Sequence, residues 1–275
     1  MRSTIKATLA AVVLAMSLVG TAVAGPFEDG FAAFGRGDYA TALRLYRPLA
    51  DQGNAVAQTM LGHMYGNGWG VPKDDAQAVK WYRLAADQGN AAAQAWLGGM
   101  YGNGLGVPQD DAQAVKWFRL AADRGNADAQ YNLGLMYSVG WGVPQDDAQA
   151  VIWYRLAADQ GNADAQNTLG SMYRNGKGVP QDYAQAVKWF RLAADQGNAD
   201  AQTRLGLEYR IGEGVPQDYA QAVKWFRLAA DRGYADGQYN LGTMYYFGQG
   251  VPQNYGKCRL NCLTDALRRP GYPLH

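Results

Sequence analysis

The sequence predicts an all-α protein, an α/α solenoid built from 36-residue helix-turn-helix repeats. Tryptophan recurs five times at intervals of 36 residues, and a Leu-Gly pair and a Val-Pro pair recur at the same interval. Each interval holds two stretches whose apolar residues follow the three- and four-residue spacing of an amphipathic helix. Glycine accounts for 35 of 275 residues, which fits a chain with many helix ends. The repeated tryptophans are Trp81, Trp117, Trp153, Trp189 and Trp225.

The repeat unit can be placed along nearly the whole chain without insertions. We expect residues 25–37 to form an N-terminal capping helix, with Phe27, Phe31 and Phe34 spaced to cover the first repeat. Residues 254–275 depart from the pattern and are predicted to be a diverged cap or the truncated end of a longer array. The six complete units between them are 38–73, 74–109, 110–145, 146–181, 182–217 and 218–253.

The unit 110–145 shows how each repeat is expected to fold. Asp110 or Asp111 can cap the first helix, over 112–123, by accepting a backbone N–H. That helix carries two apolar stripes, which predicts packing on two sides. Gly125 can end it, because glycine accepts the left-handed conformation found after helices.

The second helix of the unit follows at once. We expect Asn126 to cap it and Gly134 to permit the close approach of a neighbouring helix. A pair of short helices cannot bury its apolar faces alone, whereas stacked pairs can. The predicted architecture is therefore a stack of helix pairs, with a glycine-rich loop ending at Val143-Pro144 between this unit and the next.

The first residues have the pattern of an export signal. Arg2 and Lys6 precede an uncharged apolar run, and Ala22-Val23-Ala24 fits the small-x-small cleavage motif. A permanent membrane anchor is the alternative, because the apolar run is near the minimum length that spans a bilayer. We expect residues 1–24 to be a cleaved signal peptide, so that the protein is periplasmic or secreted and keeps no stable membrane insertion.

Charge and composition exclude several function classes. The formal net charge is +1, which argues against a nucleic-acid partner because phosphate binding needs a basic face. The chain has only two histidines and two cysteines, so we expect no metal site. Both cysteines, Cys258 and Cys262, lie in the last 18 residues, and no disulfide framework can therefore hold the repeats together.

The repeat resembles a known family. The segment 114–130, continuing to Leu133-Gly134 and to Gly140-Trp141-Gly142-Val143-Pro144, is similar to the Sel-like repeat (SLR), a relative of the tetratricopeptide repeat. The resemblance covers residues 27–253 and implies a right-handed superhelix. It also implies a scaffold or adaptor role, often exported in bacteria, with protein partners in the cell envelope. A cysteine-rich branch of the family is linked to penicillin-like compounds, but the complete units here contain no cysteine.

No catalytic or cofactor-binding constellation is apparent. After the predicted signal there are two serines, Ser138 and Ser171, and neither lies in a nucleophile motif. The Ser-x-x-Lys pattern of penicillin-binding enzymes occurs only at Ser3 to Lys6, inside the predicted signal. We therefore predict no catalytic residues and no cofactor.

Candidate binding residues are those that vary between repeats. One loop position differs between repeats, and the start of the second helix varies at Tyr131 and Asn132. The loop position holds Trp69, Leu105, Trp141, Lys177, Glu213 and Gln249, of which Trp69, Trp141, Lys177 and Glu213 are the candidates. We expect Trp69 and Trp141 to be exposed and to anchor a protein partner; neutral variation is the alternative. The tryptophan ladder is interpreted as helix packing, and sugar stacking is the other option. A lysine row is either a solvated face or a partner-binding strip; it comprises Lys80, Lys116, Lys188 and Lys224, with Ile152 interrupting it.

Three hypotheses for function follow. The first is an exported, non-enzymatic scaffold that binds a protein of the cell envelope. The alternative is a protein that binds cell-wall glycan or peptidoglycan fragments through its aromatic residues. The third is a β-lactam hydrolase, suggested only by the cysteine-rich relatives. One further residue, Glu208, stands where other repeats have methionine on an apolar stripe, and it must be buried with a partner or lie at a splayed edge.

Overall fold

The computed structural model describes residues 25–256, and this part contains thirteen α-helices and no strand. The predicted signal peptide and the residues from 257 onward, with both cysteines, lie outside it. The chain divides into two compact units at Gln88 and Gly89. An all-α solenoid of paired helices is thus confirmed.

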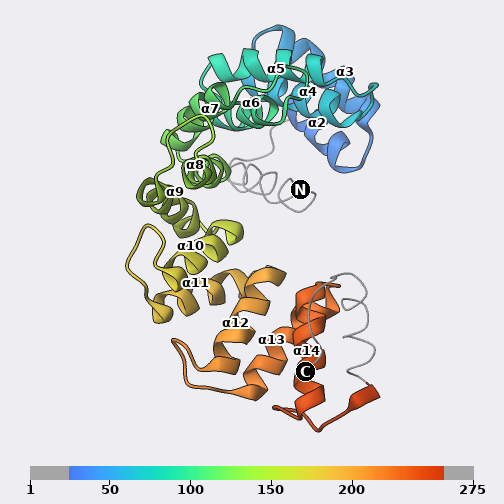
Figure 1. Cartoon of the computed structure of the whole chain (residues 1–275). Helices are drawn as coiled ribbons and strands as arrows, with labels where there is room; N and C mark the ends of the chain where they lie inside the picture. Colours follow the sequence, from blue (N-terminus) through green and yellow to red (C-terminus); the bar gives the residue numbers. More distant parts are fainter. Residues whose placement is uncertain (1–24, 257–275) are drawn as a thin grey trace. The chain divides into compact units, whose positions relative to one another are not determined.

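The helices follow one another in the predicted order (Figure 1). Unit 1 holds α2 (Pro26–Gly35), α3 (Tyr39–Asp51), α4 (Ala55–Asn67) and α5 (Asp75–Asp87). Unit 2 holds α6 (Ala91–Asn103), α7 (Asp111–Asp123), α8 (Ala127–Val139), α9 (Asp147–Asp159), α10 (Ala163–Asn175), α11 (Tyr183–Asp195), α12 (Ala199–Ile211), α13 (Tyr219–Asp231) and α14 (Ala235–Phe247). The first helix of each repeat, with an odd number from α3 to α13, is called an A helix, and the second is called a B helix.

Capping residues fix where each helix begins and ends. Asp110, and not Asp111, is the N-cap of α7, and its carboxylate accepts the backbone N–H of Gln113 at 3.0 Å. Asn126 caps α8 in the same way, accepting from Ala129 at 2.8 Å. Gly125 follows α7 with a φ of +83°, a left-handed conformation that side chains disfavour. The helix α7 begins one residue before the predicted 112 and ends at the predicted Asp123, and capping by Asp110 and Asn126 is confirmed.

The repeated Leu-Gly pair has a packing reason. A Cβ atom placed on Gly134 of α8 would lie 2.8 Å from the ring of Tyr154 on α9, and one on Gly170 of α10 would lie 2.7 Å from Phe190 on α11. Such distances are shorter than real carbon contacts, so only glycine lets the next A helix place its aromatic ring there. The close approach predicted at Gly134 is confirmed, and it is how one repeat joins the next.

The tryptophan ladder lies in the core. Trp81, Trp117, Trp189 and Trp225 are buried, and Trp153 is half-buried. Trp189 packs into the cluster of the preceding repeat with Tyr154, Leu169 and Met172. Trp81 and Trp225 likewise pack into the clusters of the repeats before them, which is the packing role that the spacing predicts.

The N-terminal helix covers the first repeat. Phe27 of α2 meets Tyr46 of α3 with ring centroids 5.6 Å apart, and Phe34 meets Tyr39 at 5.3 Å. Phe31 is half-buried. The helix α2 is shorter than the predicted 25–37 segment, but two of its three phenylalanines pack as expected.

Polar side chains also link successive repeats, from the end of an A helix or the start of a B helix to the preceding B helix. The amide Nε2 of Gln160 donates to Oε1 of Gln130 at 2.7 Å, and Gln196 donates to Gln166 at 2.8 Å. Asn198 donates to Asp164 at 2.9 Å. Bonds of this kind recur at several junctions, which therefore combine an apolar core with amide contacts that fix the register of the two repeats.

Candidate protein-binding surface

The loop position that varies between repeats is not equally exposed along the chain. Trp141 is 50% exposed, as predicted. Lys177 is also exposed, and its Nζ forms an ion pair with Asp147 at 3.1 Å. Glu213 is half-buried and forms an ion pair with Arg174 at 3.2 Å. Of the four loop candidates in the two units, Trp141 is therefore the one that presents a large apolar side chain to solvent.

The expectation that Trp69 is exposed is wrong. Its indole is half-buried, stacked on the ring of Tyr39 at 5.5 Å and 11°, with the edge of Phe34 at 5.3 Å. Trp141 lacks this shelter because Asp111 stands at the position equivalent to Tyr39, and no α2 precedes its repeat. Trp69 thus belongs to the N-terminal core and not to a surface.

Tyr131 and Asn132 do not project freely either. The ring of Tyr131 is half-buried, 5.6 Å from that of Tyr154, and burial together with the nearby Asp164 raises the pKa of its phenol. Asn132 is half-buried and donates from Nδ2 to the carbonyl of Asp128 at 2.7 Å. Both variable positions contribute mainly to local packing of α8.

Glu208 is buried with a partner. Its side chain is fully inaccessible, and Oε1 accepts from Nε of Arg174, one repeat earlier, at 2.6 Å. Burial raises the pKa of the Glu208 carboxyl, and the nearby Glu213 acts in the same direction, whereas Arg174 opposes the rise. Sequence reasoning missed Arg174 as the partner. The signal was present in the sequence, because Arg174 and Glu208 both depart from the repeat pattern and lie in neighbouring repeats.

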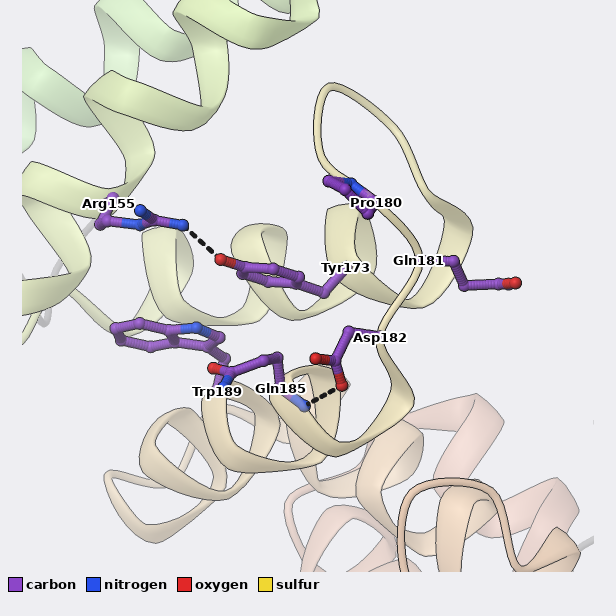
Figure 2. A pocket seen from close by; sticks show the side chains of 7 residues that line it. All are labelled: Arg155, Tyr173, Pro180, Gln181, Asp182, Gln185 and Trp189. Atoms are coloured by element: carbon purple, nitrogen blue, oxygen red, sulfur yellow. Dashed lines mark hydrogen bonds between the residues drawn. The ribbon is translucent and has the colours of Figure 1, made fainter.

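A second surface runs along the A helices, and it includes arginines and tyrosines beside the lysine row predicted from the sequence. At the junction of α9, α10 and α11 an open pocket of about 520 Å³ is lined by Arg155, Tyr173, Pro180, Gln181, Asp182, Gln185 and Trp189. Figure 2 shows Arg155 and Tyr173 lying over the indole of Trp189, while Gln181 points away from the group. Arg155 donates from Nη2 to the Tyr173 hydroxyl. The signal that could have found this pair is an arginine followed 18 residues later by a tyrosine in every repeat.

One half-buried histidine is explained by its neighbour. Nδ1 of His63 lies 3.1 Å from the Tyr82 hydroxyl, within unit 1. Burial lowers the pKa of His63 to about 4, so the ring is neutral at neutral pH. His63 and Tyr82 therefore form a polar pair inside the packing of α4 on α5.

The described residues give little sign of catalytic or metal chemistry. No group of three or more histidine, cysteine, aspartate or glutamate side chains within 25–256 could hold a metal ion. Ser138 accepts from Lys177 Nζ at 3.4 Å, and Ser171 donates to the carbonyl of Asn167 at 3.1 Å, so each serine has a structural contact. In the same range, none of the helices has both the length and the apolar composition to cross a bilayer.

Comparison with known sequences decides the family. The profile of the Sel1 repeat matches residues 25–54, 55–90, 91–126, 127–162, 163–198, 199–234 and 235–260. The chain belongs to the Sel1 repeat family. The five matches between residues 55 and 234 each begin at a B helix and end after the following A helix, whereas our repeats begin at the A helix. The first match begins with α2 and the last with α14, which is why the profile counts seven units where our numbering gives six complete ones. No curated protein matches the chain.

Solved structures of Sel1 repeat proteins share the fold. The chain is 44% identical to c5321, described as a protective antigen of uropathogenic Escherichia coli with an SLR fold, over 82% of this chain and 48% of that one, with a TM-score of 0.78. It is 32% identical to a Sel1 repeat protein from Oxalobacter formigenes, over 91% and 100% of the two chains, with a TM-score of 0.80. The chain therefore spans about half the length of the E. coli protein. An immunity protein from Pseudomonas aeruginosa, 21% identical over 78% and 81% of the two chains with a TM-score of 0.51, shares the fold alone.

Proposed function

We propose that the protein is an exported, non-enzymatic scaffold that binds another protein of the cell envelope. Membership of the Sel1 repeat family supports a protein-interaction role. The observation that carries the proposal is the contrast between repeated and variable positions. Buried leucine, glycine and alanine recur in every repeat, whereas the loop position changes each time and in unit 2 exposes Trp141. Loops on a rigid frame are where recognition is commonly found.

Export rests on the first 24 residues alone. A positively charged start, an apolar run and Ala22-Val23-Ala24 support cleavage before Gly25. We expect the chain isolated from the periplasm or the medium to begin at Gly25. N-terminal sequencing of that fraction tests this, and a chain that starts at Met1 and stays in the membrane fraction would contradict it.

The glycan-binding alternative loses its main support. A sugar platform needs accessible aromatic faces, and four of the five ladder tryptophans are buried in the repeat cores. Nothing in the described residues favours a β-lactam hydrolase either, since both serines bond to structural partners. The protein-binding role is therefore the one we carry forward.

Affinity capture tests the proposed function. The chain 25–275 is used to capture proteins from an envelope extract of its own source, in parallel with Trp141→Ala. We expect one protein to be enriched by the wild type and lost with the variant, whose fold is checked by circular dichroism. Trp69→Ala is no substitute as a surface probe, because Trp69 is part of the N-terminal core. Equal capture by the wild type and Trp141→Ala would remove Trp141 from the binding surface, and no capture at all would contradict the scaffold role.

A further inference from the structure

Cations on the two kinds of helix have different partners. In unit 2 three of the four basic residues of the B helices and the loops after them are paired with carboxylates, namely Arg174, Lys177 and Arg204. The fourth, Arg210 of α12, forms no ion pair among the described residues. The basic residues along α7, α9, α11 and α13 form no ion pair with any residue of the described range 25–256. These seven unpaired cations are Lys116, Arg119, Arg155, Lys188, Arg191, Lys224 and Arg227, and all are exposed.

Tyrosine, and not a carboxylate, holds the arginines of this row. Arg119 donates to the Tyr137 hydroxyl, Arg155 to Tyr173 and Arg191 to Tyr209. Each guanidinium carbon lies between 5.7 and 5.9 Å from the centre of the same ring. A neutral hydroxyl uses one of the five N–H donors and leaves the positive charge uncompensated. The tyrosines therefore hold the arginines in place without neutralising their charge.

The pocket between α9 and α11 adds groups that suit a peptide. The side-chain amide of Gln185 has no hydrogen-bond partner among the described residues, and an amide offers one acceptor and two donors to a backbone. Trp189 is only 8% exposed, and its indole Nε1 has no partner in the described structure. Asp182 is the acidic group of the pocket, and it already caps α11 by accepting the N–H of Gln185 at 2.9 Å. The same residue types recur at the next junction as Arg191, Tyr209, Asp218, Gln221 and Trp225.

We propose that the A-helix face of unit 2 binds an extended acidic segment of the partner protein. Successive arginines of the row each pair with a carboxylate of that segment, since guanidinium and carboxylate match in charge and geometry. The glutamine amides bond to the segment's backbone between those contacts. This inference rests on the proposed scaffold function and names the chemistry of the partner and the face that reads it.

Fluorescence anisotropy with a defined probe tests the inference. The probe is a fluorescein-labelled peptide of alternating glutamate and threonine, and the control peptide has glutamine in place of glutamate. The variant Arg155→Gln with Arg191→Gln, called the A-helix variant, removes two positive charges from the A-helix face. Arg124→Gln with Arg232→Gln removes two charges at the ends of α7 and α13, where other repeats already carry glutamine as Gln160 and Gln196. We expect the A-helix variant to bind the glutamate peptide at least about tenfold more weakly than the wild type, and the control variant to change this affinity less than about twofold.

Several results would overturn the inference. These are equal weakening by the two double variants, equal binding of the glutamine peptide, or equally tight binding of a single-stranded DNA oligonucleotide, which would indicate general attraction of anions. The proposed function fails separately. If the captured envelope protein binds Arg155→Gln with Arg191→Gln as tightly as the wild type but is lost with Trp141→Ala, the scaffold role stands and the face assigned here is wrong.

Discussion

The two compact units place the same repeat positions in different surroundings. In unit 1 the loop tryptophan, Trp69, stacks on Tyr39 under α2, whereas in unit 2 its equivalent, Trp141, is exposed. Unit 1 holds a half-buried, neutral histidine beside Tyr82, and unit 2 buries a glutamate beside Arg174. A repeat position therefore does not determine burial or charge by itself. The helices that pack against the position determine its burial. Substitutions at equivalent positions in the two units measure how much this difference changes the free energy of unfolding.

The largest effect is expected at the buried ion pair. Arg174→Ala leaves the Glu208 carboxylate buried without its cation, and removing one partner of such a pair costs about 3 kcal/mol, the lower end of the usual range because Arg174 is one-third exposed. Urea unfolding at neutral pH measures the loss. Arg124→Gln is the control, since it restores the residue of other repeats, and a loss equal to that of Arg174→Ala would contradict the pairing.

Acid should destabilise the protein through His63. Its folded pKa of about 4 lies below the ordinary value of 6.5, so the unfolded chain binds a proton that the folded chain does not. Stability is then lost as the pH falls from 6.5 toward 4, by roughly 3 kcal/mol at most. The double variant His63→Leu with Tyr82→Phe copies Leu207 and Phe226 of a later repeat. Chemical unfolding between pH 7 and pH 4 should show a smaller loss for this variant, and an identical pH dependence would exclude His63 as the cause.

Glu208 should act in the opposite direction. Its pKa is raised, mainly by burial, so the folded chain holds a proton that the unfolded chain releases as the pH rises above about 4.5, and the charged carboxyl then lowers stability. The groups that face it are Arg174, Glu213 and Arg204. Glu208→Met restores the residue of the other repeats and is expected to stabilise the protein by about 1 kcal/mol at pH 7, less at pH 4. Thermal unfolding at both values checks this, and a gain that grows at low pH would contradict it.

The periodic sequence predicts the fold well because repeated residues perform repeated tasks. Asp110, Asn126, Gly125 and Gly134 each act as their position predicts, in capping, helix ending or close packing. These roles depend on neighbours that lie within one repeat or in the next, so the period itself encodes the contacts.

The candidate surface is less predictable for the same reason. Trp69 is half-buried against Phe34 of α2, which is not part of any complete repeat, and the charge of Glu208 is met by Arg174 of the preceding repeat. The Arg155–Tyr173 pair joins two helices of one repeat, and it lies in the pattern but has no sequence motif that marks it as a ligand site. The partners of residues that depart from the repeat pattern, and the contacts between the two helices of a repeat, become apparent only in the three-dimensional structure.

The comparison of Trp69 with Trp141 tests the central claim most directly. Urea unfolding is measured for Trp69→Ala and Trp141→Ala, two identical changes at one repeat position. Removing a half-buried, stacked indole is expected to cost about 2 kcal/mol at Trp69, because ring contacts and apolar burial are lost together. At Trp141 the cost should stay below about 0.5 kcal/mol, as for other exposed side chains. Equal losses at the two sites, or a larger loss at Trp141, would contradict the account.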